Sequence, residues 1–225
     1  MDKVDIIKII ELFAPLDLQE EWDCSGAIVS TSKNQVNKIM LALTVTDDVY
    51  LQAKQSGCDM IISHHPLFCV PIKYSDIDIY CAHTNADKTL TTDQLIKKTG
   101  FNDFEKYGEF VRIVKLNNPI EIDELISRLR KISPHLRYVN NKNKKQISSI
   151  GFCAGSGSEF ITELKVDAFV TGDIKFHTAV DSNIILFDIG HFESEIFILE
   201  VFKNLIEKAS DVKIIMAKEK SPFIY

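Results

Sequence analysis

Short apolar runs alternate with segments of helical periodicity along most of the chain. Residues 3–13 place apolar side chains on one helical face, whereas residues 38–45 form a continuous apolar run that is typical of a buried strand. The same pattern predicts strands at 59–63 and 78–82 and helices at 47–56 and about 89–98. Strands that alternate with helices indicate an α/β fold with parallel or mixed sheets.

The second half of the chain repeats this alternation. The pattern predicts helices at 121–132 and 191–208, a helix carrying His177, and strands at 109–116, 147–154, 167–171, 183–189 and 212–216. The segment from Asp59 to His64 also resembles the segment from Asp167 to His177. Each has an acidic residue, a short apolar strand, a hydroxyl residue and a polar turn. We therefore expect two related α/β halves.

Three polar clusters begin where predicted strands end. His64 and His65 follow the strand at 59–63, and Asp87 follows the strand at 78–82. The third cluster, with His191 and Glu195, follows the strand at 183–189. Ligands of open α/β sheets bind at the carboxyl ends of strands, so the three clusters are expected to meet in one cleft.

The donor types in these clusters are those of a transition-metal site. His64 and His65 sit in a turn stiffened by Pro66, so both can face one site, and His191 and Glu195 are four residues apart on one helical face. Glu195 can bridge two ions with its two oxygens, and Asp87 can serve as a terminal ligand. Imidazole with carboxylate suits zinc, iron, manganese, cobalt or nickel and argues against calcium and magnesium. Five ligands leave coordination positions of two divalent ions open for water or substrate.

Each cluster taken alone also has a purely structural interpretation. The two adjacent histidines could be an incidental pair, His191 and Glu195 a surface pair on a helix, and Asp87 a helix N-cap. The Gly155-Ser156-Gly157 segment could cradle a phosphate at a helix N-terminus, although a tight turn is the favoured interpretation. His177 could reach the cleft or be a structural histidine, and both interpretations stay open.

Composition narrows the classes of function. The 225 residues carry a net charge of -6, which argues against a general nucleic-acid or membrane-surface binder. Five cysteines without a C-x-x-C pair indicate buried, reduced thiols in a reducing compartment. The first residues lack the pattern of a signal peptide, and no apolar run is long enough to span a bilayer. We therefore expect a cytoplasmic protein.

Four ordered motifs resemble the type 2 GTP cyclohydrolase homologues, also called the Ngg-interacting-factor-three family. They are DMIISHHPLF (59–68), AHTNAD (82–87), DAFVTGDIKFH (167–177) and DIGHFESE (188–195), with weaker matches at EWDCSGAIVS (21–30) and SPF (221–223). The chain departs from the family pattern at Cys24, where Asn is usual, at Ser30, where Gly is usual, and at Thr44, where Asp is common. None of these departures removes a candidate metal ligand.

The resemblance implies a pair of metal ions at matching positions, which are His64, His65, Asp87, His191 and Glu195. It also implies two interlinked α/β domains with mixed sheets and a dinuclear metal site in the cleft. We place a discontinuous metal-binding domain at 1–105 plus 183–225 and an inserted α/β domain at 106–182. The expected assembly is a toroidal homohexamer, built as a trimer of dimers.

Two classes of function fit these features. The first is a metal-dependent hydrolase, and the family resemblance implies opening of the purine ring of GTP, or reaction of another nucleotide-like small molecule, by a metal-activated water. His83 and His177 are then candidates to move protons from outside the ligand set. The second is a metal-handling or regulatory metal-binding protein in which the ions are cargo or structure.

Overall fold

The computed structural model describes residues 1–224 and divides the chain into two compact units. Unit 1 comprises residues 1–90 and 198–220, and unit 2 comprises residues 91–197 and 221–224. The chain therefore forms two interlinked α/β units, as predicted. The boundaries between these units, near residues 90 and 198, differ from the domain boundaries predicted at 105 and 183. The strand at Ile185–Asp188 pairs with Ala168–Gly172 in the sheet of unit 2, so the helix carrying His191 and Glu195 belongs to unit 2.

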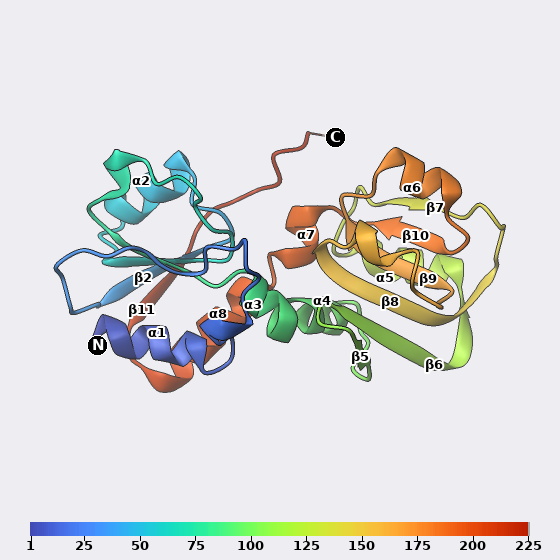
Figure 1. Ribbon diagram of the computed structural model, residues 1–225, viewed down its shortest axis with the longest axis horizontal. Coiled ribbons are helices and arrows are strands. Elements are labelled where there is room, and N and C mark those ends of the chain that lie inside the picture. Colours follow the sequence, from blue (N-terminus) through green and yellow to red (C-terminus); the bar gives the residue numbers. More distant parts are fainter. Residues whose placement is uncertain (225) are drawn as a thin grey trace. The chain divides into compact units, whose positions relative to one another are not determined.

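Unit 1 is built on a five-stranded mixed sheet (Figure 1). The strand order is β1-β4-β3-β2-β11, and only β1, at one edge, runs antiparallel to its neighbour. The strands are β1 (Gly26–Val29), β2 (Lys38–Ala42), β3 (Met60–Ser63), β4 (Asp78–Cys81) and β11 (Lys213–Met216).

Helices cover both faces of this sheet. Figure 1 shows α1 (Lys3–Glu11) and α8 (Ile198–Ala209) on one face and α2 (Asp47–Gln55) on the other. The side chain of Thr46 accepts a hydrogen bond from the Val49 amide and so caps α2. The shorter helical segments are η1 (Leu16–Leu18), η2 (Ile72–Tyr74), α3 (Thr84–Ala86) and the π-helical turn η3 (Asp87–Thr91).

Unit 2 is built on a six-stranded mixed sheet of order β5-β6-β8-β9-β10-β7. Its three consecutive parallel strands are β8, β9 and β10, and β7 pairs antiparallel with β10 at one edge. The strands are β5 (Glu105–Tyr107), β6 (Val111–Glu121), β7 (Arg137–Val139), β8 (Gln146–Ser156), β9 (Ala168–Gly172) and β10 (Ile185–Asp188).

The side chains of β8, β9 and β10 alternate between two apolar layers. Phe152, Val170 and Phe187 pack with residues of α4 and α5 on one face, whereas Phe169 and Leu186 belong to the cluster on the other face. This period of two is the pattern expected for a sheet buried on both faces. The helical elements of unit 2 are α4 (Thr92–Lys98), α5 (Ile122–Arg130), η4 (Ser158–Phe160), α6 (Phe176–Asp181) and α7 (His191–Glu195).

The predicted similarity between two halves has a structural counterpart. Asp59 precedes β3, and its Oδ2 accepts hydrogen bonds from the amides of Asn37 and Lys38 at the start of β2. Asp167 precedes β9, and its Oδ2 accepts from the amides of Ser148 and Ser149 in β8. In each sheet the acidic residue therefore fixes the neighbouring parallel strand. The parallel strands stand in a row of four in unit 1 and of three in unit 2.

One predicted helix is wrong in its extent. The helix expected at 191–208 divides into α7 and α8, with a turn at residues 196–197. The division coincides with the change of unit, because α7 lies with the sheet of unit 2 and α8 packs on β2 of unit 1.

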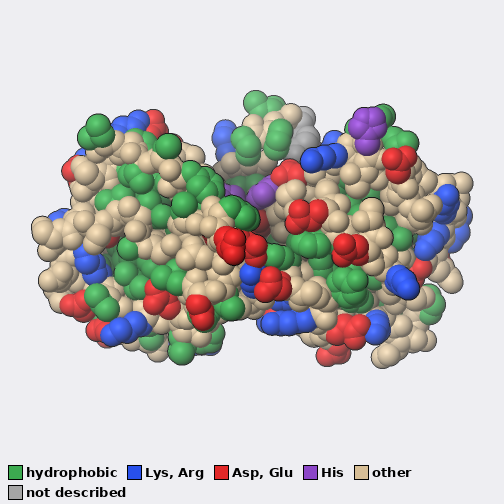
Figure 2. Space-filling model, in the orientation of Figure 1, with side chains coloured by type: hydrophobic (Ala, Val, Ile, Leu, Met, Phe, Trp, Pro, Cys, Tyr) green, Lys and Arg blue, Asp and Glu red, His purple; other side chains and the backbone are tan. Residues whose placement is uncertain are grey.

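The surface charge and the helices of the described residues are those expected from the net charge of -6 and from the short apolar runs in the sequence. Lys and Arg side chains are scattered among Asp and Glu on the face shown in Figure 2, without a continuous basic patch on that face. Within residues 1–224, none of the helices has the length and apolar character needed to cross a membrane.

Candidate metal centre

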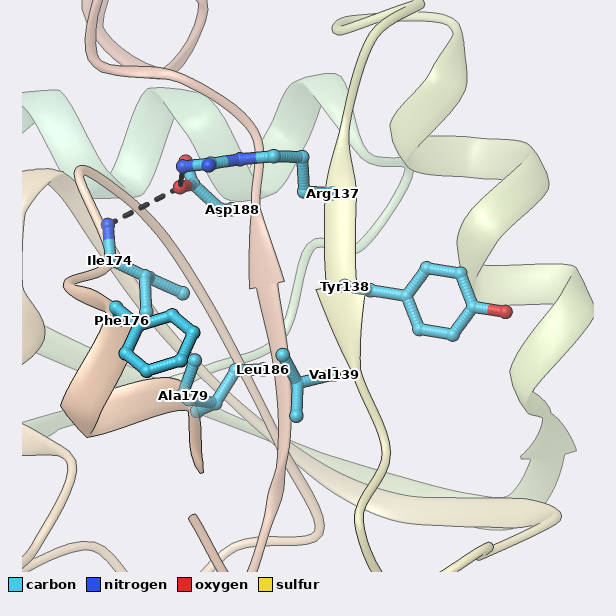
Figure 3. Close-up of a pocket in the computed structure, with 8 residues that line it drawn as sticks. All are labelled: Arg137, Tyr138, Val139, Ile174, Phe176, Ala179, Leu186 and Asp188. Carbon is cyan, nitrogen blue, oxygen red and sulfur yellow. Dashed lines mark hydrogen bonds and ion pairs between the residues drawn. The ribbon is translucent and has the colours of Figure 1, made fainter. Parts of the chain in front are cut away.

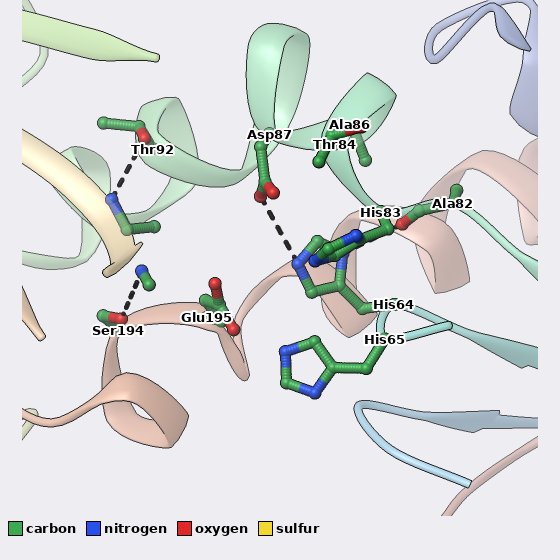
Figure 4. A network of polar contacts seen from close by, with 12 residues as sticks. His64, His65, Ala82, His83, Thr84, Ala86, Asp87, Thr92, Ser194 and Glu195 are labelled. Carbon is green, nitrogen blue, oxygen red and sulfur yellow. Dashed lines mark hydrogen bonds and ion pairs between the residues drawn. The ribbon is translucent and has the colours of Figure 1, made fainter. Parts of the chain in front are cut away.

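In unit 1, the carboxyl ends of two neighbouring parallel strands bring His64, His83 and Asp87 together. Ser63 of β3 is in register with Cys81 of β4, so the residues that follow the two strands emerge side by side. One ligand atom from each of His64, His83 and Asp87 lies within 4.8 Å of the other two. Figure 4 shows His64 pointing toward Asp87, with the rings of His65 and His83 beside it.

His64 presents one particular nitrogen to Asp87. The side chain is fully buried, and Nδ1 lies 2.9 Å from the Ala82 carbonyl oxygen, which can only accept a hydrogen bond. Nδ1 therefore carries a proton, and Nε2 of the neutral ring is the nitrogen that could bind a metal ion. That Nε2 lies 3.3 Å from Asp87 Oδ1.

Asp87 completes a pair of facing electron donors. Its buried Oδ1 accepts no hydrogen bond from the described residues. A lone pair of neutral His64 facing a buried carboxylate is unfavourable unless a cation or a proton stands between them. The donor set therefore fits a divalent transition metal. The backbone of Asp87 is helical, with φ -61° and ψ -42°, which excludes the alternative that Asp87 is an N-cap.

His65 is oriented by Thr44, one of the positions at which the chain departs from the family pattern. His65 Nδ1 lies 2.7 Å from Thr44 Oγ1, and its ring centroid is 5.2 Å from that of His64. The amides of Leu43 and Thr44 donate to the Glu219 carboxylate, which fixes the loop that follows β2. A hydroxyl thus takes the orienting role that a carboxylate has in many histidine–metal sites.

Thr44→Val should weaken metal binding. Valine keeps the shape of threonine but removes the oxygen that orients His65, so we expect the affinity for one ion to fall about tenfold. Thr44→Ser is the matched control, because serine keeps the hydroxyl. The measurement is a competition titration against a chromogenic chelator. Equal affinities of the valine and serine variants would contradict an orienting role for Thr44.

His83 has a carboxylate partner that sequence reasoning missed. Its Nδ1 lies 3.0 Å from Oδ1 of Asp23, whose side chain is fully buried. The other carboxylate oxygen accepts from the Thr84 amide and from the hydroxyls of Thr84 and Ser25. Burial alone raises the pKa of Asp23, but hydrogen bonds from His83 and Thr84 outweigh it and hold that pKa well below its usual range. Asp23 is therefore ionised and fixes the orientation of the His83 ring.

In unit 2, the turn after β10 places His191 and Glu195 on one face of α7. His191 Nε2 lies 3.0 Å from Glu195 Oε2, and His191 Nδ1 lies 2.7 Å from Asp173 Oδ2. The Glu195 side chain is 4% exposed, which excludes a solvated surface pair. Gly190 begins the helix with φ +84°, a conformation that glycine adopts without strain.

Glycines make room for this carboxylate. Gly155 has φ +68°, and a Cβ there would lie 2.2 Å from Glu195 Oε1. A Cβ at Gly172 would lie 2.7 Å from the His191 amide nitrogen. Gly155 therefore serves close packing against Glu195. The Gly155–Gly157 segment continues from β8 into the three-residue turn η4, which supports the tight-turn interpretation over a phosphate cradle.

Metal binding should release a proton from His191. Burial lowers its pKa, but Glu195 and Asp173 outweigh this effect and raise the pKa of His191 to about 9. Below pH 9 a metal ion must displace that proton in order to bind His191. The metal affinity of the chain should therefore rise about tenfold for each pH unit between pH 7 and 8. Asp173→Asn should make the metal affinity depend less steeply on pH, because the variant lacks one of the two carboxylates that raise the pKa of His191. The backbone should be unaffected, because asparagine tolerates the φ of +55° at this position. An unchanged slope in titrations of this variant would contradict the coupling.

The remaining candidate, His177, is exposed on α6, where its ring packs edge-on against Phe176 at 5.4 Å. It has no place in the described groups around His64 or His191, and its role as a proton carrier stays a prediction. The structure thus groups His64, His65, His83 and Asp87 in unit 1, and His191 and Glu195 in unit 2. Asp23 and Asp173 are the carboxylates it adds.

A family model and the similar sequences of known proteins point to the same family. The family model described as Duf34/NIF3 (NGG1p interacting factor 3) matches residues 1–222. Proteins named "GTP cyclohydrolase 1 type 2 homolog" are similar in sequence. The one from Clostridium perfringens is 32% identical, with 97% of each chain covered, and the one from Clostridium acetobutylicum is 35% identical, covering 85% of this chain and 84% of that protein.

Solved structures show the same fold. Reduced HcgD from Methanocaldococcus jannaschii has a TM-score of 0.85 at 25% identity, and it covers 97% of this chain and 98% of its own. The protein ybgI, whose function is described as unknown, has a TM-score of 0.89 at 20% identity, covering 99% of this chain and all of its own.

Proposed function

Because the chain belongs to the Duf34/NIF3 family, we propose that His64, His65, Asp87, His191 and Glu195 hold two divalent transition-metal ions in a metal-dependent hydrolase. The observation that carries the proposal is the facing pair of His64 Nε2 and Asp87 Oδ1, two buried electron donors 3.3 Å apart. The name shared by the curated relatives supports GTP or another nucleotide-like molecule as the substrate.

The donor set favours zinc, iron, manganese, cobalt or nickel. When bound, such ions supply Lewis acidity and acidify a water molecule near neutral pH. Glu195 offers two carboxylate oxygens and is the residue we assign to both ions, whereas Asp87 and the histidines each serve one ion. The Ala82 carbonyl oxygen contacts Nδ1 of His64, and the Asp173 carboxylate contacts Nδ1 of His191. These contacts keep the proton on Nδ1 and leave Nε2 of each ring for a metal ion.

We assign proton transfer to His83. Its Nδ1 is held by ionised Asp23, so its Nε2 is the atom that can accept a proton from the attacking water and deliver it to the leaving group. Its ring lies 5.3 Å from that of His64. Asp23 acts through His83 as a positioning residue, since its buried oxygens face donors of its own loop.

The experiment combines elemental analysis of the purified chain with an assay for loss of GTP and release of formate. Close to two transition-metal equivalents together with metal-dependent turnover would support a hydrolase. Two tightly held equivalents without turnover on a panel of nucleotides would instead support the metal-handling function. Absence of metal after growth with each candidate ion would overturn both.

We also propose a cytoplasmic homohexamer, built as a trimer of dimers. The proposal is supported by the family membership. Light scattering at micromolar concentration should give about six times the 25.5 kDa chain mass. A monomeric mass that does not change with added metal would contradict it.

A further inference from the structure

A hollow of about 210 Å³ lies in unit 2 between α6 and the edge strand β7. In Figure 3 the side chains of Val139, Phe176, Ala179 and Leu186 gather at one end of it, and Arg137 with Asp188 closes the other. None of the residues proposed as metal ligands lines this hollow.

The apolar end is incompletely covered by the protein. Leu186 is fully buried at the base, but Phe176 on α6 is 75% exposed, and α6 has no buried residue. Covering apolar area of this kind with an apolar group is favourable, because it removes that area from water. The shape and the lining therefore favour a ligand with an apolar body.

The polar end of the hollow is formed by the guanidinium of Arg137, which has N–H groups that donate to no described residue. Arg137 and Val139 point to the same side of β7, as alternation requires, and Tyr138 points away (Figure 3). Among the described residues, Arg137 donates only to Asp188 through Nη2, and its side chain is 73% exposed. A guanidinium has five N–H donors, so several stay available to a ligand.

Asp188, by contrast, is already satisfied. Its carboxylate accepts from Arg137 and from the amides of Ile174 and Gly190, at 3.3 and 3.1 Å. A cationic ligand would therefore have to displace existing donors, whereas an anion needs only the unused N–H groups of Arg137. Because Asp188 balances one unit of charge, a monoanion suits this end better than a phosphate dianion.

We propose that this hollow binds a small monocarboxylate with an aromatic or branched aliphatic body. The carboxylate accepts hydrogen bonds from Arg137, and the body lies against Val139, Ala179, Leu186 and the ring of Phe176. The site is separate from the hydrolytic function, and its test requires no turnover.

The test is isothermal titration calorimetry of the full chain with phenylacetate and with phenylacetamide, its neutral analogue. Phenylacetate should bind about tenfold more tightly. Arg137→Gln should remove that preference and leave phenylacetamide binding unchanged. Ala179→Phe, which fills the hollow from the helix side, should abolish binding of both. Arg130→Gln, an exposed arginine of α5, is the matched control and should change nothing.

Two results would overturn the proposal. One is the absence of phenylacetate binding at about 10 mM in a chain whose circular dichroism is native. The other is an Arg137→Gln variant that keeps the carboxylate preference. If binding appears only in a Phe176→Ser variant whose mass by light scattering has fallen, a second copy of the chain covers the hollow, which also overturns the proposal.

Discussion

Glu195→Gln is expected to remove metal from both positions of the proposed pair. Glutamine keeps the shape of glutamate, but it has one oxygen donor and no charge, so it cannot serve two cations. The Glu195 carboxylate is buried, faces His191 Nε2 and packs closely against the backbone of Gly155. We expect the dissociation constants of both ions to rise by at least about a hundredfold, on the order of 3 kcal/mol.

The measurement is elemental analysis after gel filtration, followed by titration of the metal-free chain. Glu193→Gln is the matched control, because it makes the same change on α7 at a position two residues away, which does not share the metal-binding face. Asp87→Ala should leave about one equivalent, since a terminal ligand serves one ion. Full metal content in Glu195→Gln would exclude the bridging role.

The order of strands and helices could be predicted because most of the parallel strands are buried on both faces, with the edge strand β11 as the exception. Such strands read as short apolar runs, as at β3 and β10, and the polar residues after them must lie at one edge of a sheet. This is why His64, Asp87 and His191 could be chosen from the sequence as candidate ligands, and their role as ligands stays a prediction. The turns that follow these strands bring His64 close to Asp87 and His191 close to Glu195.

What could not be predicted depends on contacts between distant positions. Asp23 meets His83 across 60 residues, and Thr44 reaches His65 across 21, and neither pair has a periodic signal. The break between α7 and α8 was missed because Ile196 and Phe197 continue the apolar period of the helix. The sheet that β10 joins has no sequence signal for a related reason, since a buried strand has the same composition whichever sheet it pairs with.

His83→Ala should lower turnover of the metal-loaded enzyme by about a hundredfold or more while the metal content stays close to that of the native chain. A positioned general acid or base contributes on this scale, and among the described histidines near His64 only His83 is backed by a buried carboxylate. Asp23→Asn should lower kcat less than His83→Ala does, because the imidazole remains but loses its fixed orientation. Both changes should affect kcat more than KM.

His177→Ala is the informative comparison. Sequence reasoning assigned it the same role, yet its ring is exposed beside Phe176, so a native turnover in this variant would restrict proton transfer to His83. Chelation should abolish activity in every variant, and manganese, iron or zinc should restore it in proportion to the turnover each variant retains. If His83→Ala loses metal instead, His83 is itself a ligand, as its approach within 4.8 Å of His64 and Asp87 allows. Asp23 would then be the carboxylate that orients a metal-bound imidazole, and Asp23→Asn should lose metal rather than turnover.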